Sequence, residues 1–143
     1  MINANTLTAP VEHKILVVDD DESICELLKT FLSDHYDVTT AISGTEAMKL
    51  IDENDFDLIV TDLILPDMLP SGTGIDILAH AKARDEFVEV LMITGHGSVD
   101  TAAEAINGGV GSYMLKPFSM QEMRARVEKM IASRMFHLKS LQL

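Results

Sequence analysis

The feature that most constrains this chain is an alternation of short apolar runs with amphipathic stretches. The runs are rich in β-branched residues, as in KILVVDD at 14–20 and FDLIVTD at 56–62. Strands of this kind are buried on both faces, which is typical of a parallel sheet. The intervening stretches place apolar residues three and four apart, as in DESICELLKTFLSD at 21–34, which predicts helices packed against that sheet.

Five strand–helix units follow one another along the chain. We expect strands at 14–20, 36–41, 56–62, 88–94 and 111–117, and helices at 21–34, 43–54, 74–84, 98–108 and 119–141. Right-handed crossovers between parallel strands place such helices on both faces of the sheet. The predicted fold is therefore α/β, a doubly wound five-stranded parallel sheet in a three-layer, flavodoxin-like (βα)5 sandwich.

Length and charge narrow the class of protein. The 143 residues fit one domain, which we place at 13–132, after a flexible lead at 1–12 and before a helix extension or linker at 133–143. A net charge of −12 disfavours direct binding of nucleic acid phosphates. We expect a cytoplasmic protein without a membrane segment, because a single cysteine allows no internal disulfide and no apolar run reaches about 20 residues.

Acidic residues gather at the ends of two predicted strands. Asp19 and Asp20 close the first strand, and Asp62 closes the third. Ligands of doubly wound folds bind beyond the carboxyl ends of the strands, where these carboxylates would converge and repel one another. A shared hard cation relieves that repulsion, and Mg²⁺ prefers such oxygen ligands. The alternative is an acidic cluster that only favours the dipole of the following helix.

Two further polar residues end the neighbouring strands. Thr94 closes the fourth strand and Lys116 the fifth. A lysine, a hydroxyl and a metal ion around one carboxylate form a pocket for a dianionic group, typically a phosphoryl group. Each residue alone is weak evidence, and their placement at consecutive strand ends carries the prediction.

Four motifs resemble the receiver domain of two-component response regulators, over residues 13 to 132. They are ILVVDDDESI, DLIVTDLILPDM, GIDIL and VLMITGHGSVDTAAEAINGGVGSYMLKPF. The motif sequences most resemble those of nitrogen-regulator-type activators. The resemblance implies a phosphoacceptor signalling switch that catalyses only its own phosphorylation and dephosphorylation and is not otherwise an enzyme. The implied partners are a sensor histidine kinase or phosphotransfer protein, a phosphatase, an output domain or target protein, and a second copy of the chain.

The resemblance also implies roles for the acidic residues. Asp62 matches the aspartate that accepts the phosphoryl group. Asp20, Asp62 and the backbone carbonyl of Ile64 match the Mg²⁺ ligands, and Asp19 matches an acid that reaches the ion through water.

The remaining matched positions concern the phosphoryl group and the switch. Thr94 matches a hydroxyl that bonds a phosphoryl oxygen and moves on activation, and Lys116 matches the lysine that pairs with the phosphate. Tyr113 matches an aromatic residue that swings inward as Thr94 moves. The bond before Pro117 matches one that is usually cis.

The loop behind Asp62 departs from the family pattern. Gly74 lies eight positions after Pro66, where receivers have a glycine four positions after the proline, so Asp67–Thr73 contains an insertion of unassigned role. Ile64 and His96 occupy positions at which receivers vary the lifetime of the phosphorylated form. Because Ile64 is apolar, we expect it to shield an acyl phosphate from water and to slow self-dephosphorylation.

Two other functions are compatible with parts of the sequence. A haloacid-dehalogenase-type phosphatase would use Asp19 as its nucleophile, in Asp19-x-Asp21-x-Ser23, but no later acidic pair follows Lys116. A flavodoxin-like cofactor binder would need a phosphate loop where this chain has carboxylates.

The last predicted helix carries apolar residues near a heptad spacing, interrupted by Arg134. They are Met123, Val127, Ile131, Leu138 and Leu141. A core-facing helix explains this pattern up to about residue 132, and beyond it a connector or a dimer seam are equally compatible.

Overall fold

The computed structural model describes residues 12–68, 73–95 and 108–142. Its centre is a sheet of five parallel strands, as the alternating pattern predicts. The strand order is β2-β1-β3-β4-β5. The strands are β1 (His13–Val18), β2 (Tyr36–Ala41), β3 (Leu58–Asp62), β4 (Glu89–Thr94) and β5 (Ser112–Leu115).

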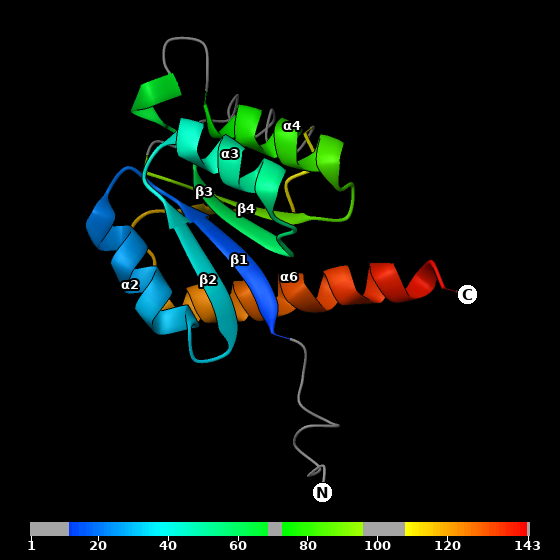
Figure 1. The fold of residues 1–143 in the computed structure, drawn as a ribbon. Helices are drawn as coiled ribbons and strands as arrows, with labels where there is room; N and C mark the ends of the chain where they lie inside the picture. Colours follow the sequence, from blue (N-terminus) through cyan, green and yellow to red (C-terminus); the bar gives the residue numbers. More distant parts are fainter. Residues whose placement is uncertain (1–11, 69–72, 96–107, 143) are drawn as a thin grey trace, which may run out of the picture.

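Helices cover both faces of the sheet, which confirms the three-layer arrangement (Figure 1). They are α2 (Glu22–Leu32), α3 (Gly44–Glu53), α4 (Gly74–Arg84) and α6 (Met120–Ser140), with a short 3-10 turn, η1 (Pro66–Met68). Helices α3 and α4 lie on one face, and α2 and α6 lie on the other. The helix expected at 98–108 lies almost entirely outside the described residues.

Strand β1 shows how the sequence builds two cores at once. Ile15 and Val17 pack with α2 and α6, whereas Leu16 and Val18 pack with α3 and α4, because successive side chains of a strand point to opposite faces. All four side chains are fully buried. Each such burial contributes about 1.5–3 kcal/mol, which is why this run contains no polar residue.

Polar residues cap the helices that begin at the carboxyl edge of the sheet. Asp21 accepts a hydrogen bond from the backbone of Ser23 at the start of α2, and Ser43 accepts one from the backbone of Glu46 at the start of α3. Thr73 is the N-cap of α4 and forms a complete capping box there. These caps satisfy amide groups that a helix start otherwise leaves unpaired, so each helix begins where the sequence predicts.

Helix α6 packs its apolar side into the core of the domain. Met123, Val127 and Ile131 are buried there, so these three do not form a dimer seam. Arg134 is also buried, and its Nε donates to Oδ1 of Asp57 at 2.8 Å, while Nη1 lies 3.1 Å from Oδ2 of Asp85. The residue that interrupts the heptad pattern therefore ties α6 to the opposite end of the sheet from the acidic cluster.

No helix in the described ranges combines the length and apolar character needed to cross a bilayer.

Candidate functional site

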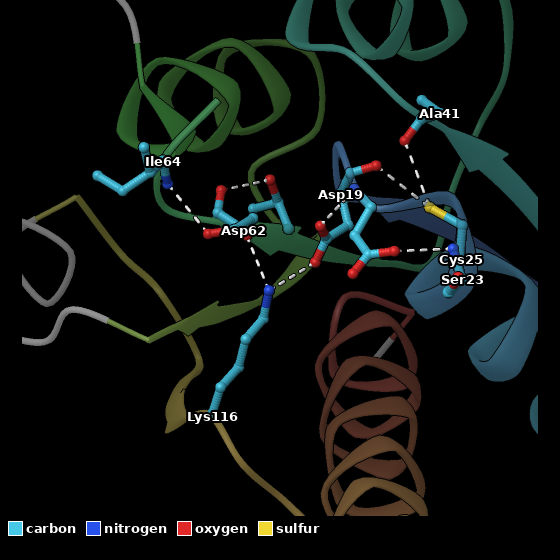
Figure 2. A network of polar contacts seen from close by, with 9 residues as sticks. Asp19, Ser23, Cys25, Ala41, Asp62, Ile64 and Lys116 are labelled. Atoms are coloured by element: carbon cyan, nitrogen blue, oxygen red, sulfur yellow. Dashed lines mark hydrogen bonds and ion pairs between the residues drawn. The ribbon is translucent and has the colours of Figure 1, made fainter. Parts of the chain in front are cut away.

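The register of the strands brings the predicted residues to one edge of the sheet. Strand β1 runs beside β3, Asp62 pairs with Ile93 of β4, and Thr94 pairs with Leu115 of β5. The residues that follow these strand ends therefore lie together, as Figure 2 shows for Asp19, Asp62 and Lys116.

Three carboxylates form the centre of this edge. Asp19, Asp20 and Asp62 each offer one oxygen, and these oxygens lie within 4.8 Å of one another. Nζ of Lys116 lies 2.8 Å from Oδ2 of Asp19 and 2.9 Å from Oδ2 of Asp62. One ammonium group cannot balance three carboxylates, so the cluster keeps an excess negative charge. Oxygen ligands with that excess charge fit a divalent cation such as Mg²⁺.

The two aspartates that share Lys116 differ in access. Asp19 is fully buried, and both its oxygens are engaged: Oδ1 accepts from the backbone of Asp21 at 2.9 Å and Oδ2 from Lys116. A carboxylate enclosed in this way cannot approach a substrate. The burial therefore argues against the phosphatase alternative, which requires Asp19 as the nucleophile.

Asp62 reaches an open pocket. Its Oδ1 accepts a hydrogen bond from the backbone of Ile64 at 3.1 Å, and its Oδ2 accepts one from Lys116. Burial raises the pKa of Asp62, even though the Lys116 and Ile64 hydrogen bonds act in the opposite direction. The pocket is lined by Asp20, Asp62, Ile64, Pro66, Gly95 and Lys116.

Lys116 remains protonated between its two partners. Burial alone would lower its pKa, but the hydrogen bonds to Asp19 and Asp62 and their charges raise it. The Lys116–Pro117 peptide bond is cis, as the resemblance implies. The backbone of Lys116 donates to the carbonyl of Thr94 at 2.8 Å, which fixes the start of this turn against β4.

Thr94 and Tyr113 lie on the same face of the sheet. Thr94 is fully buried at the end of β4, and Met92, two residues earlier, pairs with Tyr113. Side chains two apart on a strand share a face, and Tyr113 packs against the α3–α4 core. The Tyr113 hydroxyl is buried and has no hydrogen-bond partner among the described residues. His96 lies outside the described residues.

One residue beside the site was not singled out from the sequence. Asp67, at the start of the predicted insertion, accepts hydrogen bonds from the backbones of Gly44 and Thr45 at the start of α3. Aspartate is a common helix-capping residue, and this is the signal that the sequence contains. Gly44 and Thr45 precede Asp67 in the chain by more than twenty residues, so no local spacing could identify this contact.

Residues 15–128 match the family model of the response regulator receiver domain. The chain belongs to this family. It is 38% identical over 119 residues to the transcriptional regulatory protein ZraR of Escherichia coli, covering 82% of this chain but only 26% of ZraR. It is 37% identical over 120 residues to the chemotaxis protein CheY of Pseudomonas aeruginosa, covering 81% of this chain and 94% of CheY.

A solved receiver-containing protein has the same fold. A response regulator from Burkholderia pseudomallei, with a phosphorylated aspartic acid, a calcium ion and citrate, superimposes with a TM-score of 0.72 at 29% identity. The match covers 80% of this chain and 65% of that one. This receiver domain is therefore a phosphoacceptor signalling switch of a two-component system and not an enzyme in the ordinary sense.

Proposed function

We propose that Asp62 is the phosphoacceptor of this receiver domain. The observation that carries the proposal is that Asp62 both lines the open pocket and contacts Lys116, whereas Asp19 contacts Lys116 without reaching the pocket. The phosphoryl group would come from a phosphohistidine of a sensor histidine kinase or of a phosphotransfer protein. The phosphorylated aspartic acid of the Burkholderia pseudomallei relative supports this chemistry by analogy.

The proposed metal ligands are the carboxylates of Asp20 and Asp62 and the backbone carbonyl of Ile64. Asp19 would reach the ion through water. The close approach of the three carboxylates supports this set, as does the side chain of Asp20, which has no hydrogen-bond or ion-pair partner among the described residues. A bound Mg²⁺ would neutralise charge on the transferring phosphoryl group.

The transfer itself is a displacement at phosphorus. A carboxylate oxygen of Asp62 would form the new P–O bond while the P–N bond of phosphohistidine breaks, and the bonding electrons would return to the imidazole. Lys116 would pair with the phosphoryl oxygens. Because Lys116 also contacts buried Asp19, it keeps one partner and its position while the carboxylate of Asp62 becomes an acyl phosphate, a mixed anhydride.

We propose that Thr94 and Tyr113 convert this chemistry into a conformational change. The Thr94 hydroxyl would bond a phosphoryl oxygen, and Tyr113 would shift on the same face of the sheet. The buried, unpaired hydroxyl of Tyr113 supports a second position, because an unsatisfied buried donor is unfavourable by about 1–3 kcal/mol. The readers of this change would be an output domain or target protein in the cytoplasm, with a phosphatase and a second copy as further partners.

The phosphoacceptor assignment is tested by replacing Asp62. Asp62→Asn removes the attacking oxygen's charge but keeps the shape of the side chain. We expect the wild type to gain one phosphoryl group from acetyl phosphate and Mg²⁺, measured by intact mass, and Asp62→Asn to gain none. Asp55→Asn is the control, because its exposed carboxylate pairs with Arg84 and with no other side chain in the described part of the protein. Borohydride reduction should label Asp62, and a label on Asp19 would refute the assignment.

A further inference from the structure

We propose that Asp67 is a positioning residue that holds the metal-binding loop against helix α3. The proposal rests on the metal site proposed above, and in particular on the carbonyl of Ile64. Asp67 touches neither the pocket nor the acidic cluster, so its effect would be transmitted through the backbone between residues 64 and 67.

The carboxylate of Asp67 makes three hydrogen bonds to one helix start. Oδ1 accepts from the backbone of Gly44 at 2.8 Å, and Oδ2 accepts from the backbone and the hydroxyl of Thr45 at 3.0 and 2.8 Å. Ser43 already caps this helix through the backbone of Glu46. The two aspartate oxygens therefore satisfy the amides that Ser43 leaves unpaired, and a negative charge there is also favoured by the helix dipole.

Packing reinforces the same contact. The side chain of Met68 lies directly over Gly44, where an added Cβ would be only 2.0 Å from Sδ of Met68. The backbone of Met68 donates to the carbonyl of Leu65 at 3.0 Å, and Leu65 is fully buried. Two independent contacts, one polar and one apolar, thus attach the turn η1 to the start of α3.

The other side of the loop is held by the sheet. The backbone of Leu63 donates to the carbonyl of Ile93 at 3.0 Å, and the carbonyl of Leu63 accepts from Gly74 at 2.7 Å. Ile64 therefore lies between two residues with buried side chains, Leu63 and Leu65. Its carbonyl accepts no hydrogen bond from any residue that the structure describes, which leaves the carbonyl oxygen available to a metal ion.

Placement matters here because Mg²⁺ requires near-ideal octahedral geometry. A backbone carbonyl cannot adjust by rotating a side chain, so its position depends on the loop that carries it. Removing partners that orient metal ligands typically weakens metal affinity by about 10- to 100-fold. We expect the removal of Asp67 to weaken the affinity for Mg²⁺ by about tenfold, the lower limit of this range, because Leu63 and Leu65 still hold the loop.

The experiment compares Asp67→Ala with Ser43→Ala. Both changes weaken the start of α3, but only the first releases the loop. We expect the apparent Kd for Mg²⁺, from thermal-shift titration of the metal-free protein, to rise about tenfold in Asp67→Ala and to stay within about twofold in Ser43→Ala. Amide exchange of Gly44 and Ile64 without metal should accelerate in Asp67→Ala. Thr45→Val, which removes only the hydroxyl hydrogen bond, should have a small effect and provides a milder variant if Asp67→Ala fails to fold.

The outcomes separate this inference from the proposed function. If the wild type does not respond to Mg²⁺, the proposed metal site is wrong. If the wild type responds and Asp67→Ala has an unchanged Kd, the positioning role is wrong while the metal site stands. Equal weakening in Asp67→Ala and Ser43→Ala would also overturn the inference, since general destabilisation of α3 would then explain both.

Discussion

At the scale of single residues, charged groups at this edge of the sheet each serve more than one partner. Lys116 bridges Asp19 and Asp62, and Asp67 bridges the backbones of Gly44 and Thr45. A charge with two partners has little freedom to reorient, which limits the entropy lost when a ligand binds. The two aspartates that contact Lys116 also have different roles: buried Asp19 positions the lysine, and Asp62 faces the pocket.

The Asp67 contact should depend on pH. Partial burial alone would raise the pKa of Asp67, but the hydrogen bonds from Gly44 and Thr45 outweigh it and lower the pKa below 3.8. The stabilisation is therefore complete well above pH 3.8 and is lost as the pH falls through the lowered pKa. Both carboxylate oxygens of Asp67 accept hydrogen bonds, whereas the amide of asparagine offers only one accepting oxygen. We therefore expect Asp67→Asn to be less stable than the wild type by about 1 kcal/mol at pH 7, and the gap to narrow toward pH 3. Urea denaturation across this range measures it, and a gap that stays constant would contradict the assignment.

At the scale of elements, the start of α4 packs directly against the backbone at the end of β3. A Cβ on Gly74 would lie 2.3 Å from the carbonyl oxygen of Asp62 and 3.0 Å from Sδ of Met92. The backbone of Gly74 also donates to Leu63. Glycine is needed here because the helix backbone approaches the end of β3 more closely than any side chain allows.

Gly74→Ala should consequently destabilise the domain. We expect a loss of about 1–3 kcal/mol, because the alanine methyl group would collide with backbone and not with a flexible side chain. Gly95→Ala is the matched control, since an added Cβ there meets nothing within 4 Å. Chemical denaturation of both variants gives the comparison. Equal stabilities would show that α4 can move away from β3 at little cost.

At the scale of the whole molecule, charged side chains are arranged differently at the two ends of the sheet. The carboxyl edge concentrates carboxylates around one lysine, in a chain whose net charge is −12. At the opposite end, Arg134 of α6 forms ion pairs with both Asp57 and Asp85, which connects the segments preceding β3 and β4 to the last helix. The ion pairs of Arg134 hold α6 against the sheet, whereas the three carboxylates around Lys116 favour the binding of a cation.

Mg²⁺ should therefore stabilise the whole domain. Binding only to the folded state adds about 2.7 kcal/mol when free Mg²⁺ is about a hundred times its Kd, and the Tm should rise accordingly. Asp20→Asn should raise the Tm of the metal-free protein, because one like charge is removed, and should abolish most of the response to Mg²⁺. Sodium chloride at matched ionic strength controls for screening. An equal rise with sodium chloride would indicate general charge screening and no specific site.

Much of the fold and of the site could be predicted from local sequence. The segments ILVV of β1 and LIV of β3 are entirely apolar and rich in β-branched residues, which predicts buried strands. Once the strands are parallel, their carboxyl ends meet, and Asp19, Asp62 and Lys116 must lie at one edge. The helix starts could also be predicted, because Ser43 and Thr73 act within their own first turns.

Local sequence thus specifies the order of the elements, the parallel sheet and the edge at which its charged residues meet, because hydrophobic periodicity and capping act over a few residues. Three features depend instead on the packing of the folded domain: the enclosure of Asp19, the need for glycine at position 74 and the burial of Arg134. The contact of Asp67 with the start of α3 is also visible only in the folded domain. These features depend on how helices pack against the sheet, which brings together residues that are far apart in the chain.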